Sequence, residues 1–228
     1  MLADPEHGTE HALPFSHWEG SELQKRLGVA DGRCFLGVAG TLAATDYWAD
    51  CGYVHFSCHG SGDEVFAARS HLRLADDLLL AHDVLHRKPA LKPGAVVVLN
   101  GCETSVPDWR AVNESMGLMT AFLLRGAGVV LSTQWHVYDL CAAPMALHFA
   151  EQVRAGRSPV AAMRAARAEL RAMPRSAVAE LVRAAKAVGS KGDARGPAPA
   201  LPAWVLVSAR PFDNPVFWAA FQLVGRGS

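Results

Sequence analysis

The sequence has no excess of charge of either sign and no long hydrophobic run. Its 228 residues include 22 Lys and Arg against 22 Asp and Glu, so the formal net charge is zero. This balance gives no electrostatic argument for binding nucleic acid or an anionic membrane, and we expect neither as a partner. No apolar run approaches the roughly 18–20 residues of a membrane span, and residues 1–10 lack the basic and apolar regions of a signal peptide. We therefore expect a cytoplasmic protein.

Cysteine is scarce, and its pattern argues against a disulfide framework. The chain has five cysteines, an odd number, with no Cys-x-x-Cys pair among them. Cysteine in a reducing compartment is usually a small buried hydrophobe, so we expect most of the five to be inert. Cys102 is the exception, because of the residues around it.

Short apolar runs predict the strands of an α/β fold. Residues 53–57, 95–99 and 128–132 are strong strand candidates, and 34–38 is a weaker one. Their near-continuous apolar character favours a sheet that is covered on both faces. Helical patterns alternate with these runs, which predicts a mostly parallel sheet with right-handed crossovers. The predicted helices cover residues 21–27, 43–48, 75–86 and 116–125, followed by two longer ones around 145–153 and 160–170.

The last third of the chain predicts a loop and a closing strand. Residues 173–203 are rich in Ala, Arg, Gly and Pro, which predicts a helix followed by a flexible loop over 187–203. The apolar segment 216–224 predicts a strand at an edge of the sheet. We treat residues 1–228 as one domain.

A histidine and a cysteine follow two consecutive predicted strands. His59 and Gly60 come just after 53–57, and Cys102 comes just after 95–99. Ligands of parallel sheets bind beyond the carboxyl ends of the strands, and neighbouring strands lie about 4.8 Å apart. A thiol near an imidazole is the minimum for nucleophilic cysteine catalysis. The alternative is that His59 caps a turn and Cys102 is one more buried thiol, but the matching positions beside glycines favour the dyad. The backbone N–H groups of Gly60 and Cys102 would then form the oxyanion hole.

The other histidines give weaker signals. His82 and His86 are spaced i, i+4 beside Asp83, a possible metal pair, but no third ligand has suitable spacing. We expect a solvated helix face there and no metal site. His55 lies inside a predicted strand, and we expect a hydrogen-bonded core histidine.

Several motifs, in the same order along the chain, resemble the CHAT family of caspase-like domains, which often occur with tetratricopeptide repeats. The matching segments read His-Phe-Ser-Cys-His-Gly at 55–60, Leu-Asn-Gly-Cys-Glu-Thr at 99–104, Ser-Thr-Gln-Trp-His-Val-Tyr-Asp at 132–139 and Asn-Pro-Val-Phe-Trp-Ala-Ala-Phe-Gln-Leu at 214–223. The resemblance extends over about residues 13–225. It implies the three-layer caspase-hemoglobinase fold with a His–Cys dyad, no metal or organic cofactor, and a setting in bacterial stress or defence pathways.

The sequence departs from the pattern of caspases and of the CHAT family in two ways. His59 precedes Cys102 by 43 residues, near the caspase spacing of about 50, but the cysteine motif differs, so caspase specificity does not carry over. Leu-Pro-Phe-Ser-His-Trp-Glu at 13–19 resembles a segment that usually follows a complete strand, and residues 1–5 look like only the tail of that strand. We therefore expect a truncated first strand, completed by an N-terminal extension or by a partner chain.

These observations favour one functional interpretation and leave two alternatives. The favoured interpretation is a cysteine endopeptidase that cleaves a protein or peptide substrate and is regulated by a partner or an upstream sensor region. The alternatives are a catalytically inactive caspase-like interaction module and a cysteine acyltransferase or thioesterase.

Four residues near the predicted dyad are candidates for binding the substrate: Glu103, Gln134, Trp135 and Asp139. Trp135 lies in the groove or in the core, and the sequence does not separate the two. For Asp139 the alternative role, an N-cap of a helix starting near Leu140, is the favoured one.

Overall fold

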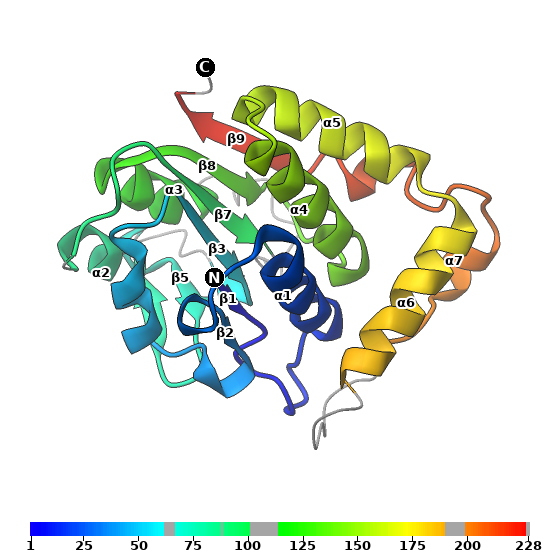
Figure 1. The fold of residues 1–228 in the computed structure, drawn as a ribbon, viewed down its shortest axis with the longest axis horizontal. Helices are drawn as coiled ribbons and strands as arrows, with labels where there is room; N and C mark the ends of the chain where they lie inside the picture. The colour runs from blue at the N-terminus through cyan, green and yellow to red at the C-terminus, as the bar shows by residue number, and fades with distance from the viewer. Residues whose placement is uncertain (62–66, 88, 101–113, 190–198, 227–228) are drawn as a thin grey trace.

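The computed structural model describes residues 1–61, 67–87, 89–100, 114–189 and 199–226. Its centre is a six-stranded sheet in which five strands are parallel and the last is antiparallel (Figure 1). The strand order is β2 (Phe35–Leu36), β1 (Leu2–Ala3), β3 (Tyr53–Ser57), β7 (Ala95–Asn100), β8 (Ala127–Thr133) and β9 (Phe221–Gly225). This confirms the predicted α/β class with its mostly parallel central sheet.

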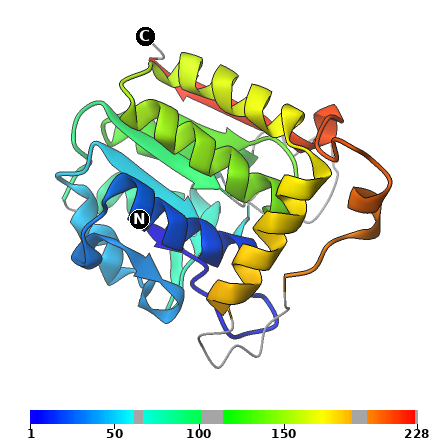
Figure 2. The same ribbon diagram turned by 45° about the vertical axis from the view of Figure 1, so that its right-hand side comes forward.

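Helices cover both faces of the sheet and complete three layers (Figures 1 and 2). Successive residues of β7 point to opposite layers, because Val98 belongs to one hydrophobic cluster while Val97 and Leu99 belong to the other. The first cluster packs under α1 (Pro14–Leu27), α4 (Asp139–Arg154), α5 (Pro159–Ala172) and α6 (Arg175–Gly189). The second includes residues of α2 (Ala81–His86) and α3 (Glu114–Leu124), and α7 (Ala203–Leu206) lies near the first.

Helix α1 is longer than predicted and packs very closely on the sheet. Proline occupies its first turn, and Gly28 ends it in the left-handed region at a φ of 64°. A Cβ on Gly20 would lie 2.6 Å from Leu36 Cδ2 and 2.8 Å from Ala3 Cβ. Gly20 therefore allows the close approach of α1 to β1 and β2.

One strand of a small antiparallel sheet lies where the first half of a helix was predicted. The sheet consists of β4 (Gly60–Ser61), β5 (His71–Arg73) and β6 (Leu78–Leu80). The prediction of a helix over 75–86 is wrong up to residue 80, because Leu79 is fully buried and its strand pairs with β5. Helix α2 begins only after Leu80, whose N–H donates to Asp83 Oδ2 at 3.3 Å.

The other predicted elements agree with the structure to varying degrees. Strand β3 has the predicted bounds, and β7 and β8 are longer by one or two residues. The closing strand begins at 221 rather than 216, because a 3-10 turn (Pro215–Phe217), capped by Asn214, precedes it. Helix α6 extends to Gly189 and α7 starts at Ala203, so both overlap the ends of the loop predicted over 187–203.

The first strand is short but lies inside the sheet. Leu2 and Ala3 pair with β2 on one side and with β3 on the other. The outer strands are β2 and β9, so a chain that extended this sheet would add beside one of them.

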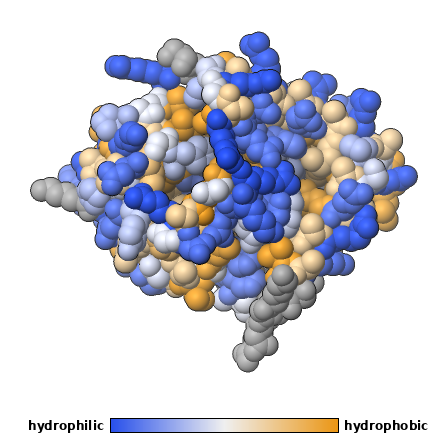
Figure 3. All heavy atoms as spheres, in the orientation of Figure 1, coloured by the Kyte–Doolittle hydropathy of each residue, from blue (hydrophilic) through white to orange (hydrophobic). Residues whose placement is uncertain are grey.

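None of the helices in the described ranges is long and apolar enough to cross a membrane. On the face drawn in Figure 3, hydrophilic and hydrophobic residues are interspersed. This surface agrees with the balanced composition of the chain.

Candidate functional site

His59 lies two residues beyond the carboxyl end of β3, next to the buried Cys58. Its Nε2 lies 2.7 Å from the carbonyl oxygen of His11. A carbonyl oxygen only accepts, so Nε2 carries the hydrogen, and a neutral His59 has its lone pair on Nδ1. Nδ1 is a buried atom. This tautomer makes Nδ1 the basic nitrogen of the ring.

The register of β3 and β7 aligns the two segments that carry the predicted dyad. Ser57 pairs with Asn100, so positions 59 and 102 each lie two residues beyond one matched pair. Neighbouring parallel strands are about 4.8 Å apart at such a pair. Cys102 and Glu103 lie outside the described residues, so the alignment rests on the strand ends.

A pocket opens beside His59. It has a volume of ≈ 240 Å³, and its lining includes Gly60, Glu6 and Arg73. The backbone N–H of Arg73 donates to the backbone carbonyl oxygen of His59 at 2.8 Å, and the Arg73 guanidinium lies 3.4 Å from Glu6 Oε1. The pocket wall therefore has both a cation and an anion.

Gly60 pairs with Leu72 of β5 in an antiparallel register. Hydrogen bonds of antiparallel strands alternate between neighbours, and the residue before Gly60 already bonds to β5. The N–H of Gly60 is therefore directed away from β5.

A buried carboxylate ties the two strand ends together. Glu19 of α1 is fully buried, and its Oε2 accepts hydrogen bonds from Ser57 Oγ and Asn100 Nδ2, both at 2.8 Å. Its Oε1 lies 2.6 Å from His55 Nε2. Ser57 and Asn100 are the last residues of β3 and β7, so Glu19 fixes the ends of both strands relative to each other.

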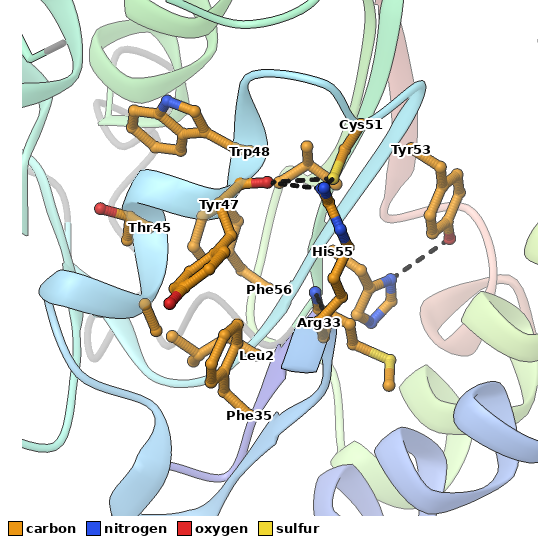
Figure 4. A pocket seen from close by; sticks show the side chains of 13 residues that line it. Leu2, Arg33, Phe35, Thr45, Tyr47, Trp48, Cys51, Tyr53, His55 and Phe56 are labelled. Carbon is orange, nitrogen blue, oxygen red and sulfur yellow. Dashed lines mark hydrogen bonds between the residues drawn. The ribbon is translucent and has the colours of Figure 1, made fainter. Parts of the chain in front are cut away.

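Two further residues complete this buried network. The Tyr53 hydroxyl lies 3.2 Å from His55 Nδ1 (Figure 4). Burial, and to a lesser extent Glu19, raise the pKa of Tyr53 well above its usual range, so the hydroxyl keeps its proton and donates it. His55 then accepts at Nδ1 and donates from Nε2 to Glu19. The prediction of a hydrogen-bonded core histidine is confirmed.

The sequence reasoning missed the role of Glu19. The signal was present in polar residues at positions 55, 57 and 100, inside or at the end of otherwise apolar strands. Buried polar groups need partners, so these three required an acceptor from another element.

Two of the four substrate-binding candidates lie just beyond β8 and are exposed. The backbone N–H of Gln134 donates to the carbonyl oxygen of Ala220 at 2.8 Å, and the indole Nε1 of Trp135 donates to the carbonyl oxygen of Val216 at 3.0 Å. Trp135 is 36% exposed, so its indole is tethered at the nitrogen while part of the ring faces solvent. The preceding Thr133 is buried and pairs with β9, which confines the accessible part of this segment to residues 134–136.

Asp139 is the first residue of α4 and Tyr138 is its N-cap, so the prediction that Asp139 is the N-cap is wrong by one residue. Its carboxylate accepts the N–H of Phe15, in the first turn of α1, at 3.2 Å, and also that of Leu140. Burial, together with the nearby Asp4 and Glu19, raises the pKa of Asp139 to about 6, although the two backbone hydrogen bonds act in the opposite direction. Asp139 therefore joins the N-termini of α1 and α4.

Three of the four described cysteines, Cys34, Cys58 and Cys141, have environments unlike that of a nucleophile. Cys58 and Cys141 are buried, and burial raises the pKa of Cys141 far above its usual range. Burial also raises the pKa of Cys34. Cys51 lies 3.0 Å from an Arg33 nitrogen, at a pocket near the opposite end of β3 (Figure 4). That pocket has a volume of only ≈ 30 Å³, about the space of one water molecule.

The predicted solvated helix face is present on α2. His82 and His86 are exposed, with ring centroids 4.4 Å apart, and His82 Nδ1 lies 3.5 Å from Asp83 Oδ1. Within the described ranges, the group of three residues whose ligand atoms lie close enough together to hold a metal ion is not on α2: it consists of Asp4, His7 and His17.

Comparisons with known proteins agree with the architecture. The family model of the CHAT domain matches residues 1–226, essentially the whole chain. No curated protein matches the sequence.

Proposed function

The chain belongs to the CHAT domain family, a caspase-like, peptidase-related group, and from this premise we propose that it is a cysteine endopeptidase with Cys102 as nucleophile and His59 as general base and acid. One observation carries the proposal. The β3–β7 register aligns Ser57 with Asn100, and the two proposed catalytic residues follow at equal distance. The reaction would take place beyond the carboxyl ends of these strands, in an intracellular setting.

The proposed first half of the reaction forms an acyl-enzyme. His59 Nδ1 removes the proton of the Cys102 thiol, and the thiolate attacks the carbonyl carbon of the scissile peptide bond. The backbone N–H groups of Gly60 and Cys102 stabilise the oxyanion. His59 then gives the proton to the amide nitrogen as the C–N bond breaks.

The second half regenerates the enzyme. A water molecule gives a proton to His59 and attacks the thioester carbon. The S–C bond breaks, the peptide acid leaves, and the proton returns to the Cys102 sulfur. The hydrogen bond from Nε2 to the His11 oxygen supports both halves, because it holds the ring in one tautomer throughout.

Substrate contacts are proposed on two sides of this centre. The pocket with Arg73 and Glu6 lies beside His59, and both charges can contact polar groups of a peptide. Gln134 and Trp135 are proposed on the other side, where the exposed indole offers an apolar wall, and Glu103 is proposed as a further contact because it follows Cys102 in the sequence. A partner chain or an upstream sensor region is proposed to regulate the site.

Peptide hydrolysis tests the proposal. The wild type, Cys102→Ala and His59→Ala are incubated with a diverse peptide library, and new termini are identified by mass spectrometry. Cys58→Ala is the matched control, because it removes a neighbouring thiol that the proposal does not use. We expect cleavage by wild type and Cys58→Ala only. Cleavage that survives in Cys102→Ala contradicts the proposal, as does a folded chain that cleaves acyl-thioesters but no peptide.

A further inference from the structure

Three ligand-type atoms converge near the start of the chain, outside the proposed dyad. Asp4 Oδ2 lies 2.9 Å from His7 Nδ1 and 3.6 Å from His17 Nδ1. All three atoms lie within 4.8 Å of one another. The two imidazole rings are stacked, with centroids 4.0 Å apart. Two histidines therefore present the same nitrogen to one carboxylate oxygen.

The fold holds the central carboxylate in place. Asp4 follows β1 with a φ of 48°, a left-handed conformation that few residues other than glycine adopt. Its N–H donates to the Ser57 oxygen at 2.8 Å, and its Oδ1 accepts the N–H of Leu13 at 2.8 Å. Asp4 is 1% exposed. The hydrogen bond from the Leu13 N–H to Oδ1 fixes the orientation of the carboxylate, so that Oδ2 faces the two histidines. Residues outside the coordination shell of a metal ion orient its ligands in the same way.

Hydrogen bonding within the described residues does not account for this cluster. Nδ1 of His17 is buried and has no hydrogen-bond partner among these residues. It lies 3.6 Å from Asp4 Oδ2, an oxygen that already pairs with His7. Buried polar atoms are rarely left unsatisfied. A cation at the centre would satisfy all three groups at once.

We propose that Asp4, His7 and His17 bind a divalent transition-metal ion of the zinc type. The ligands are the Asp4 carboxylate and the two Nδ1 atoms, with a water molecule in the fourth position. Imidazole nitrogen favours zinc and its neighbours over calcium or magnesium. Ligands about 2.0–2.2 Å from zinc in a tetrahedron lie about 3.4 Å apart, close to the separations of 2.9 and 3.6 Å found here. Binding releases the proton shared by Asp4 and His7.

The site has a structural consequence for His59. His7 and His11 belong to the same segment, residues 4–13, and the His11 oxygen holds His59 Nε2. A metal ion would fasten this segment to the first turn of α1 through His17. We therefore expect zinc to raise the melting temperature of the chain whether or not peptides are cleaved.

Metal titration of the purified full chain tests the proposal, after removal of any affinity tag and of metal by a chelator. Isothermal calorimetry with Zn²⁺ should give one equivalent with a Kd below about 10 µM. Co²⁺ should give visible tetrahedral bands without thiolate charge-transfer absorption. His7→Gln and His17→Gln should each weaken binding at least tenfold, and circular dichroism should show both variants folded.

Two controls separate this site from others. His82→Gln changes an exposed histidine of similar spacing and should leave the affinity unchanged. Cys102→Ala should also leave it unchanged, so failure of the peptidase proposal and failure of the metal proposal are distinguishable. Absence of binding at 10 µM, binding retained in His17→Gln, or binding lost in Cys102→Ala would overturn the proposal.

Discussion

Replacing Glu19 by alanine should destabilise the fold far more than a typical charge deletion. The carboxylate accepts three hydrogen bonds at 2.6–2.8 Å, from His55, Ser57 and Asn100, and the site is fully buried. Hydrogen bonds to charged groups contribute roughly 1.5–3 kcal/mol each, and the three donors would lose their acceptor together. The three bonds share one acceptor, so their contributions do not add, and removing a buried charge recovers part of its desolvation cost. We expect a net loss of about 4 kcal/mol.

The assay is thermal and chemical unfolding at pH 7. A loss of this size lowers the melting temperature by about 8–16 °C in a domain of this length. Glu22→Ala is the matched control, because Glu22 lies on the same helix and pairs at the surface with Lys25 and Arg26, both at 3.0 Å. Such exposed pairs contribute less than about 1 kcal/mol. Glu19→Gln should lie between the two, since an amide replaces one acceptor oxygen by a donor.

Two results would refute this reasoning. One is a Glu19→Ala variant that loses no more stability than Glu22→Ala. The other is a Glu19→Gln variant as stable as the wild type, which would mean that Glu19 only fills space. Because the network positions the strand ends, folded Glu19→Gln should also lower kcat of the proposed peptidase with little change in KM.

Three further predictions concern other positions. Asp139→Asn should stabilise the chain at pH 7 by at most about 3 kcal/mol. Its raised pKa of about 6 in the folded state means that the wild type loses stability as the pH rises from about 4 to 6, and the uncharged asparagine avoids this loss. Unfolding at pH 4 should therefore show no gain, and an Asp139 pKa of 4 or below measured by NMR would contradict the prediction. Gly20→Ala should cost about 1–3 kcal/mol in urea unfolding despite the higher helix propensity of alanine, because the new Cβ lies 2.8 Å from Ala3 Cβ, which can move only with its strand; a neutral effect would show that α1 and β1 shift apart freely. Trp135→Ala should slow peptide turnover about tenfold while alkylation of Cys102 by a small reagent stays unchanged, and equal loss of both with a lower melting temperature would place the indole in the core.

The sequence was sufficient for the elements whose pattern is local. Strands β3, β7 and β8 are short, apolar and bounded by turn residues, so their positions could be predicted within a residue or two. Residues 78–80 are three leucines without a helical or alternating period, and their pairing with β5 depends on a partner that local patterns do not reveal. The central position of β1 likewise depends on contacts with β2 and β3 rather than on its two residues.

The site was only partly predictable for the same reason. His59 and Gly60 come just after the apolar residues of β3, a local pattern from which the position of His59 could be predicted. The Glu19 network joins residues from α1, β3 and β7, and the Asp4 cluster joins β1, the following turn and α1. Neither has a characteristic spacing: the Glu19 network forms only when distant segments fold together, and the Asp4 cluster depends on how the turn after β1 leads into α1.

Alkylation of Cys102 across a range of pH tests the proposed His59–Cys102 dyad most directly. Wild type and His59→Ala are treated with a small excess of iodoacetamide between pH 5 and 9, and the rate at each cysteine is measured by peptide mass mapping. An imidazole partner lowers the pKa of a thiol below its usual value of about 8.5, so Cys102 should react first and already at pH 6–7. His59→Ala should slow that reaction at pH 6–7 at least tenfold. A Cys102 that reacts with an ordinary midpoint near pH 8.5 and without dependence on His59 would contradict the dyad.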